Sequence, residues 1–93
     1  MSDVLDAIAA AVAERRDSDP ETSYVASLNV KGIDKILAKV GEEAVEVVLA
    51  AKNADSSMGD SADVINEVAD LVFHILVMLD RPVSYTHLRA HET

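Results

Sequence analysis

Apolar side chains recur along the chain every three to four residues, which is the repeat of an α-helix. Segments rich in Ser, Asp, Gly and Pro interrupt this repeat and favour turns. Short polar residues that cap helix N-termini stand before the apolar runs: Ser2, Thr22 or Ser23, and Asp60 or Ser61. The pattern predicts an all-α fold with four helices per chain: Ser2 to about Arg16, about Tyr24 to Asn29, Ile33 to Lys52 or Asn53, and about Ser61 to Asp80.

Carboxylates interrupt the apolar pattern of the two long helices at matching places. Glu43 and Glu46 are three residues apart in the third helix, as are Glu67 and Asp70 in the fourth. Each pair therefore lies on one side of its helix, about one turn apart. At about 100° per residue, Glu43 falls at the edge of the main apolar stripe and Glu46 just beyond it. An unpaired charge beside apolar surface is costly, so two such pairs favour a cation held between the helices.

The apolar faces of the long helices are wide. Over the middle of the fourth helix, the polar side chains form one narrow strip of Asp63, Glu67, Asp70 and His74, with Asn66 further round. One short antiparallel partner cannot cover faces of this width. We therefore expect a homodimer whose bundle is completed by helices from both copies.

Composition narrows the class of protein. With 93 residues, 49% of them hydrophobic and only three aromatic, the chain fits one small helical domain. The formal charge of −9 argues against nucleic-acid binding, which needs a basic face. There is no Cys, which excludes disulfides and thiolate metal sites and fits a reducing compartment. No apolar run is long enough for a membrane span, so we expect a cytoplasmic protein without membrane contacts.

The residue types of the acid cluster point to a hard divalent ion. Mg²⁺ and Mn²⁺ take oxygen ligands, and Mg²⁺ is commonly held by carboxylates together with substrate phosphates. An ion of this kind polarises phosphoryl oxygens and neutralises the departing charge. Glu-x-x-Glu alone is common on exposed helices, so the spacing by itself leaves a solvated acidic surface as the alternative.

Longer stretches carry a family resemblance. Residues 23–32, 34–46 and 50–53, together with the motif Glu67-x-x-Asp70-Leu71-Val72-x-His74, resemble the phosphoribosyl-ATP pyrophosphohydrolase family of the MazG-like all-α pyrophosphohydrolases. The resemblance covers residues 1–80. It implies a dimeric helical bundle and Mg²⁺-dependent cleavage of phosphoribosyl-ATP into phosphoribosyl-AMP and pyrophosphate, the second step of histidine biosynthesis. It also implies four metal ligands: Glu43, Glu46, Glu67 and Asp70.

The resemblance leaves the proton acceptor open. Glu43, Glu46 and Glu42 are the candidates for taking a proton from the attacking water. Glu42 lies nearly opposite the main apolar stripe, so its alternatives are a supporting role beside the ligands and a surface role. His74, one turn beyond Asp70, either orients Asp70, touches a phosphate or is a structural histidine. Tyr24 either stacks on a base or lies at the edge of the core.

Lysines are the candidate phosphate ligands. Lys39 lies on the same flank as Glu43 and Glu46, where it contacts a phosphate or pairs with Glu43 at i,i+4. Lys31 and Lys35 are further candidates, with a solvated helix face as the alternative for each.

The C-terminal residues depart from the family. From Arg81 to Thr93 the helical repeat stops, and the sequence looks like translated cloning or vector sequence. We therefore expect an enzyme domain over residues 1–80 and a non-native tail over 81–93. Two other functions stay open: a house-cleaning nucleoside-triphosphate pyrophosphohydrolase with the same four acids, or a helical bundle that mediates association without catalysis.

Overall fold

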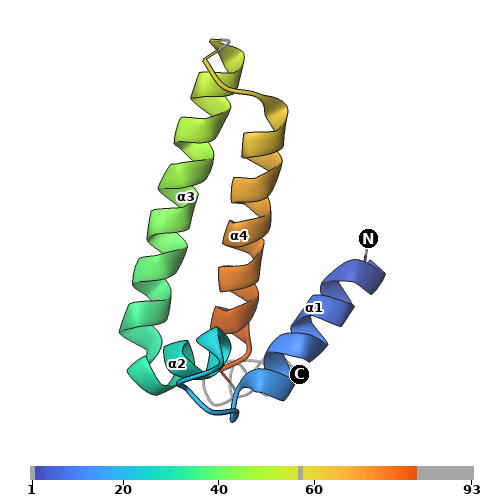
Figure 1. The fold of residues 1–93 in the computed structure, drawn as a ribbon, viewed down its shortest axis with the longest axis vertical. Coiled ribbons are helices and arrows are strands. Elements are labelled where there is room, and N and C mark those ends of the chain that lie inside the picture. The colour runs from blue at the N-terminus through green and yellow to red at the C-terminus, as the bar shows by residue number, and fades with distance from the viewer. Residues whose placement is uncertain (1, 57, 82–93) are drawn as a thin grey trace, which may run out of the picture.

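The computed structural model describes residues 2–56 and 58–81, and these residues form four α-helices. They are α1 (Ser2–Arg15), α2 (Tyr24–Lys31), α3 (Ile33–Asp55) and α4 (Ser61–Leu79). The long helices α3 and α4 lie side by side and run in opposite directions, α2 crosses one end of the pair, and α1 leans away from it (Figure 1). The all-α prediction is confirmed, and the predicted helix ends hold to within about one turn.

Local caps explain where the helices begin. The Ser23 side chain accepts a hydrogen bond from the Ala26 N–H at 3.2 Å, and the Asp60 side chain accepts one from the Asp63 N–H at 3.1 Å. Each bond satisfies an N–H that has no partner inside its helix. The Ser2 side chain, which was predicted as a cap, lies outside the described part of the chain.

Gly32 alone connects α2 to α3. Its φ of 99° lies in the left-handed region, where a side chain is disfavoured, and its N–H donates to the Leu28 carbonyl at 3.0 Å. The bond completes the end of α2 while the next residue begins α3. The chain therefore turns sharply at this point, which sets α2 across the end of the long helices.

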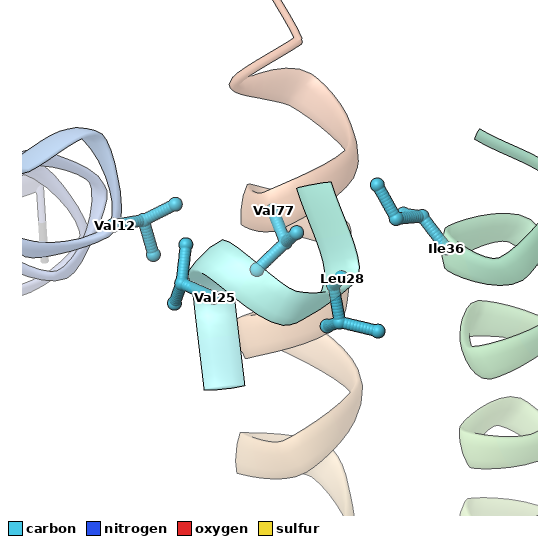
Figure 2. Close-up of a cluster of buried hydrophobic side chains, with 5 residues drawn as sticks. All are labelled: Val12, Val25, Leu28, Ile36 and Val77. Atoms are coloured by element: carbon cyan, nitrogen blue, oxygen red, sulfur yellow. The ribbon is translucent and has the colours of Figure 1, made fainter. Parts of the chain in front are cut away.

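A small core joins all four helices at the end where α2 lies. Figure 2 shows its five side chains, contributed by α1 (Val12), α2 (Val25, Leu28), α3 (Ile36) and α4 (Val77). Ile36 is fully buried and Leu28 is 1% exposed. Burial of a side chain of this size stabilises a fold by about 1.5–3 kcal/mol. This end is therefore the anchor that fixes the relative position of α3 and α4.

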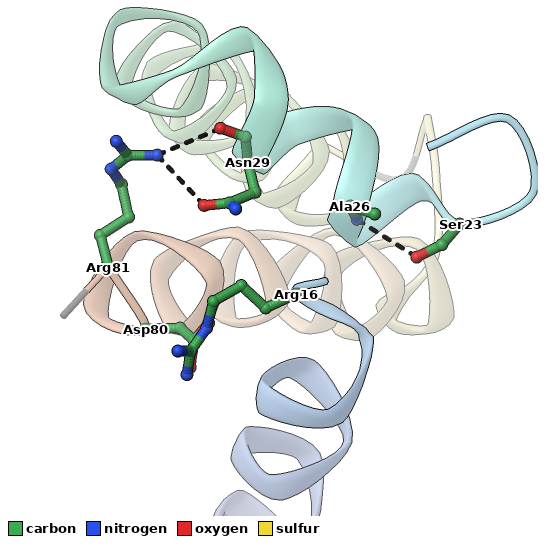
Figure 3. A network of polar contacts seen from close by, with 6 residues as sticks. All are labelled: Arg16, Ser23, Ala26, Asn29, Asp80 and Arg81. Atoms are coloured by element: carbon green, nitrogen blue, oxygen red, sulfur yellow. Dashed lines mark hydrogen bonds and ion pairs between the residues drawn. The ribbon is translucent and has the colours of Figure 1, made fainter. Parts of the chain in front are cut away.

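Two arginines close the same end of the molecule (Figure 3). Arg16 donates to both carboxylate oxygens of Asp80, with Nε–Oδ2 at 2.7 Å and Nη2–Oδ1 at 2.9 Å. Arg81 donates from Nη1 to the Asn29 backbone oxygen at 3.3 Å and to its side-chain oxygen at 3.2 Å. The segment after α1 and the end of α2 are thereby tied to the end of α4.

The apolar stripe predicted on α3, which includes Ile36, Leu37 and Val48, is only partly covered in the single chain. Ile36 is fully buried, whereas Leu37 is 46% exposed and Val48 65% exposed. The further exposed apolar side chains of α3 and α4 include Val45, Leu49, Ile65 and Val68. Among the described residues, no helix is long and apolar enough to cross a membrane. The predicted non-native tail, apart from Arg81, lies outside the described residues.

Candidate metal centre

The antiparallel packing of α3 and α4 brings predicted ligands from both helices together. Glu43 on α3 and Asp70 and His74 on α4 each offer a ligand atom, and these atoms lie within 4.8 Å of one another. Glu43 and His74 are buried, with 8% and 3% of their surface exposed, whereas the Asp70 side chain is 49% exposed. The cluster therefore has a buried floor and one side open to solvent.

Glu43 is the member of this cluster whose ionised form is disfavoured. Burial raises the pKa of its carboxyl group, and a hydrogen-bonding interaction with Asp70 and the charge of Asp70 raise it further, while His74 and Lys39 act in the opposite direction. Two neighbouring carboxyl groups that both ionise repel each other, and a buried one also loses hydration. A divalent cation would relieve both costs. The donor set, hard carboxylate oxygens with one open side, therefore fits Mg²⁺ or Mn²⁺.

The other two predicted ligands lie one turn along the helices, toward the α3–α4 loop. Glu46 and Glu67 both line a cleft of about 310 Å³ between α3 and α4. The structure thus places all four acids along the facing sides of the two helices. Only Glu43 and Asp70 of these four belong to the tight cluster.

Lys39 sits beside the cluster as its local cation. Its Nζ lies 3.2 Å from a Glu42 oxygen and 3.7 Å from a Glu43 oxygen. The hydrogen bond to Glu42 is the main cause of the raised Lys39 pKa, and the charges of Glu42 and Glu43 also raise it. The i,i+4 pairing with Glu43, one of the two alternatives for Lys39, is therefore observed, and Glu42, with a 60% exposed side chain, shares it. Lys31 and Lys35 are exposed and lie nearer the α2–α3 junction.

Both ring nitrogens of His74 are engaged. Nδ1 lies 2.8 Å from the Asp70 backbone oxygen, which can only accept, so Nδ1 is the donor. In the neutral ring, Nε2 then accepts from the Tyr24 hydroxyl at 2.8 Å. Nδ1 is also 3.4 Å from Asp70 Oδ1. His74 therefore contacts Asp70 in the way that suits an orienting residue, and a role as metal ligand would require it to give up one of these bonds.

The sequence analysis did not predict the contacts that some residues of the site make. The bond from Tyr24 to His74 joins helices far apart in the sequence, and no local pattern indicates it. Asn53, Met58 and Asp63 line the cleft beside Glu46 and Glu67. The sequence did indicate two of these residues. Asp63 is four residues before Glu67 and Asn53 is seven residues after Glu46, and residues at these spacings lie on the same face of a helix.

The comparison with known families agrees with this geometry. A family model described as phosphoribosyl-ATP pyrophosphohydrolase matches residues 5–82, which include all four helical acids and most of the described chain. Members of this family are hydrolases that release pyrophosphate, and the family depends on divalent metal in general. The chain therefore belongs to the phosphoribosyl-ATP pyrophosphohydrolase family.

Proposed function

We propose that this chain hydrolyses phosphoribosyl-ATP between its α and β phosphorus atoms, giving phosphoribosyl-AMP and pyrophosphate, with Mg²⁺ held by Glu43, Glu46, Glu67 and Asp70. Family membership supports a histidine-pathway pyrophosphohydrolase. The observation that carries the finer proposal is the contact between Glu43 and Asp70 from opposite helices, one of them buried. Such a pair is unfavourable without a cation and favourable with one.

The cation, when bound, would polarise the phosphoryl oxygens and neutralise charge on the pyrophosphate. The acids of the chain supply the rest. A carboxylate that binds the cation through one oxygen can accept the proton of the attacking water on its other oxygen, but Glu43 and Asp70 already face each other in the tight cluster. Glu46 faces the cleft one turn away from them, and we assign it that proton. The attacking water forms a P–O bond, the α–β anhydride P–O bond breaks, and the electron pair leaves with its oxygen.

In this proposal Lys39 contacts the phosphates and Glu42 positions Lys39. In the metal-free chain the Lys39 ammonium group pairs with Glu42 and Glu43. When Glu43 binds a cation instead, Lys39 loses one of its two partners and is available to a phosphate oxygen. Glu42 then keeps the Lys39 side chain beside the site, which makes it a positioning residue.

We also propose that the working unit is a homodimer. The single chain leaves large apolar side chains of α3 and α4 in solvent: Leu37, Val45, Val48, Leu49, Ile65 and Val68. Its radius of gyration is 15.2 Å, whereas a compact domain of this length has about 12 Å. A second copy packed on these faces would supply the missing burial. Sedimentation equilibrium tests this, and a monomer at micromolar concentration would contradict it.

The enzymatic proposal is tested by pyrophosphate release. We expect release from phosphoribosyl-ATP that stops on addition of EDTA and returns with Mg²⁺ or Mn²⁺. Preferential release from ordinary or modified nucleoside triphosphates would support the house-cleaning alternative. A folded chain that neither turns over substrate nor binds Mn²⁺ would support an association module.

Substitution of one acid tests the site itself. Glu46→Gln keeps the shape of the side chain but removes its charge, so we expect turnover to fall by at least about 100-fold with the helical circular dichroism unchanged. Glu14→Gln, at an exposed position on α1, is the matched control and is expected to keep wild-type turnover. Near-normal activity of Glu46→Gln would exclude Glu46 as an essential residue.

A further inference from the structure

The tight cluster of the metal centre mixes two kinds of ligand. Glu43 and Asp70 offer carboxylate oxygens and His74 offers a ring nitrogen, and the three ligand atoms lie within 4.8 Å of one another. Carboxylates suit Mg²⁺ and Mn²⁺, whereas an imidazole nitrogen suits Zn²⁺, Ni²⁺ and Cu²⁺. The availability of the ring nitrogen therefore decides which class of cation the cluster prefers.

Hydrogen bonds occupy both nitrogens of the His74 ring. A metal binds a ring nitrogen through its lone pair, and the neutral ring has only one such nitrogen. Nδ1 lies 2.8 Å from the Asp70 backbone oxygen, where a bare nitrogen would face the lone pairs of that oxygen, so Nδ1 carries the proton. The free lone pair is then on Nε2, and the Tyr24 hydroxyl donates to it at 2.8 Å. The hydroxyl thus occupies the one lone pair that a cation would need.

Packing holds the Tyr24 hydroxyl in this place. Tyr24 is the first residue of α2, directly after the Ser23 cap, and the next residue, Val25, is buried in the core. The Tyr24 ring stacks on Phe73 with centroids 6.1 Å apart, and the His74 ring meets both of them edge to face, at 5.6 Å and 5.1 Å. Because His74 is only 3% exposed, its ring turns only if this packing opens.

We propose that the Tyr24 hydroxyl keeps His74 out of the metal coordination, so that the centre offers only oxygen ligands and selects Mg²⁺ or Mn²⁺ over Ni²⁺ or Zn²⁺, an inference that rests on the metal site of the proposed function. Ni²⁺ and Zn²⁺ bind most mixed sites more tightly than Mn²⁺ does, so a free imidazole here would favour the wrong cation. Tyr24 acts through His74 and is a specificity-determining residue of the centre.

Removal of the hydroxyl tests this selectivity. In Tyr24→Phe the buried Nε2 has no hydrogen-bond donor, and coordination of a cation becomes the way to satisfy it. Mn²⁺ and Ni²⁺ affinities of the full chain are measured by calorimetry without substrate. We expect Mn²⁺ to bind more weakly and Ni²⁺ at least as tightly as in the wild type, so that the ratio of Ni²⁺ to Mn²⁺ affinity rises by at least about tenfold. An unchanged ratio would overturn the inference.

Matched variants separate selectivity from stability. All chains compared carry His87→Ala and His91→Ala, because histidines elsewhere in the sequence also bind Ni²⁺. Val25→Ala removes core contacts of the same helix and leaves the hydroxyl, so we expect lower stability and an unchanged ratio. Adding His74→Phe to Tyr24→Phe removes the ring nitrogens and should abolish the rise. A raised ratio in Val25→Ala, or one that persists in the Tyr24→Phe and His74→Phe double variant, would contradict the role of Tyr24.

Pulsed electron paramagnetic resonance of the Mn²⁺-loaded wild type tests the same point without any substitution at the site. We expect no hyperfine coupling from a directly bound imidazole nitrogen, and a coupling of this kind that is lost in His74→Phe would overturn the inference. A wild type that binds no Mn²⁺ would overturn it together with the metal site. A wild type that binds Mn²⁺ with the expected selectivity but does not turn over phosphoribosyl-ATP would overturn the proposed function alone.

Discussion

We predict that loss of the hydrogen bond between Tyr24 and His74 destabilises the folded chain. Tyr24→Phe removes one hydroxyl and keeps the ring, which packs on Phe73 with ring centroids 6.1 Å apart. His74 is 3% exposed, and its Nε2 would lose its partner. Among the described residues, every buried side-chain nitrogen and oxygen atom has a hydrogen-bond partner, so the substitution would create the first exception.

The magnitude follows from burial. A buried polar atom without a partner costs about 1–3 kcal/mol. Tyr24 is 48% exposed, which lets water approach from its side, so we expect the lower half of this range, about 1–2 kcal/mol. For a domain of this size, each kcal/mol corresponds to about 4–8 °C in Tm. The wild type and the variant must be compared at one chain concentration, since association also shifts apparent stability.

A double-mutant cycle identifies the source of the loss. Urea unfolding of the wild type, Tyr24→Phe, His74→Phe and the double variant measures the coupling between the two side chains. We expect a coupling of about 1 kcal/mol, and Mn²⁺ affinity weakened by about tenfold in Tyr24→Phe because His74 no longer holds Asp70 firmly. A coupling near zero together with an unchanged Tm would refute the reasoning. Unchanged Mn²⁺ affinity with normal coupling would limit the bond to a structural role.

Two further predictions concern single residues. The pKa of Glu43 is raised in the folded chain, so the stability that its protonated form contributes is fully present below the unfolded-state pKa and is lost as pH rises through the folded-state pKa. In EDTA, the unfolding free energy should therefore fall as pH rises above about 4.5, Mg²⁺ should oppose this fall, and Glu43→Gln should make the fall smaller. A pH profile of Glu43→Gln identical to that of the wild type would contradict this assignment. Gly32→Ala is expected to lower the unfolding free energy, measured in urea, by about 1–2 kcal/mol. The φ of Gly32 is 99° and nothing lies within 4 Å of the added Cβ, so the loss comes from backbone strain and not from a steric clash. Gly41→Ala is the contrasting control: its Cβ also meets nothing within 4 Å, no positive φ is involved, and the helix should gain up to about 1 kcal/mol. A loss at Gly41 instead would indicate that a partner helix approaches the backbone there.

Local signals determined the secondary structure of this chain. The helical repeat, the Ser23 and Asp60 caps and the stop at Gly32 act within a few residues, so the helix bounds follow from the sequence. The same holds for the spacing of the acids, which places each pair on one side of its helix. The all-α class and the two acid pairs, Glu43 with Glu46 and Glu67 with Asp70, could be predicted for this reason.

Tertiary packing decided which side of each helix is covered and what the acids meet. The helical repeat places Ile36 and Leu37 in one stripe, but only the side that α2 and α4 cover is buried, so Ile36 is enclosed while Leu37 is 46% exposed. Glu43, expected at the edge of the stripe, is buried against Asp70. The contact of Tyr24 with His74 spans fifty residues of sequence. A helical repeat defines angles around one axis, whereas such contacts depend on how separate axes pack, and here the turn at Gly32 and the shared core decide that.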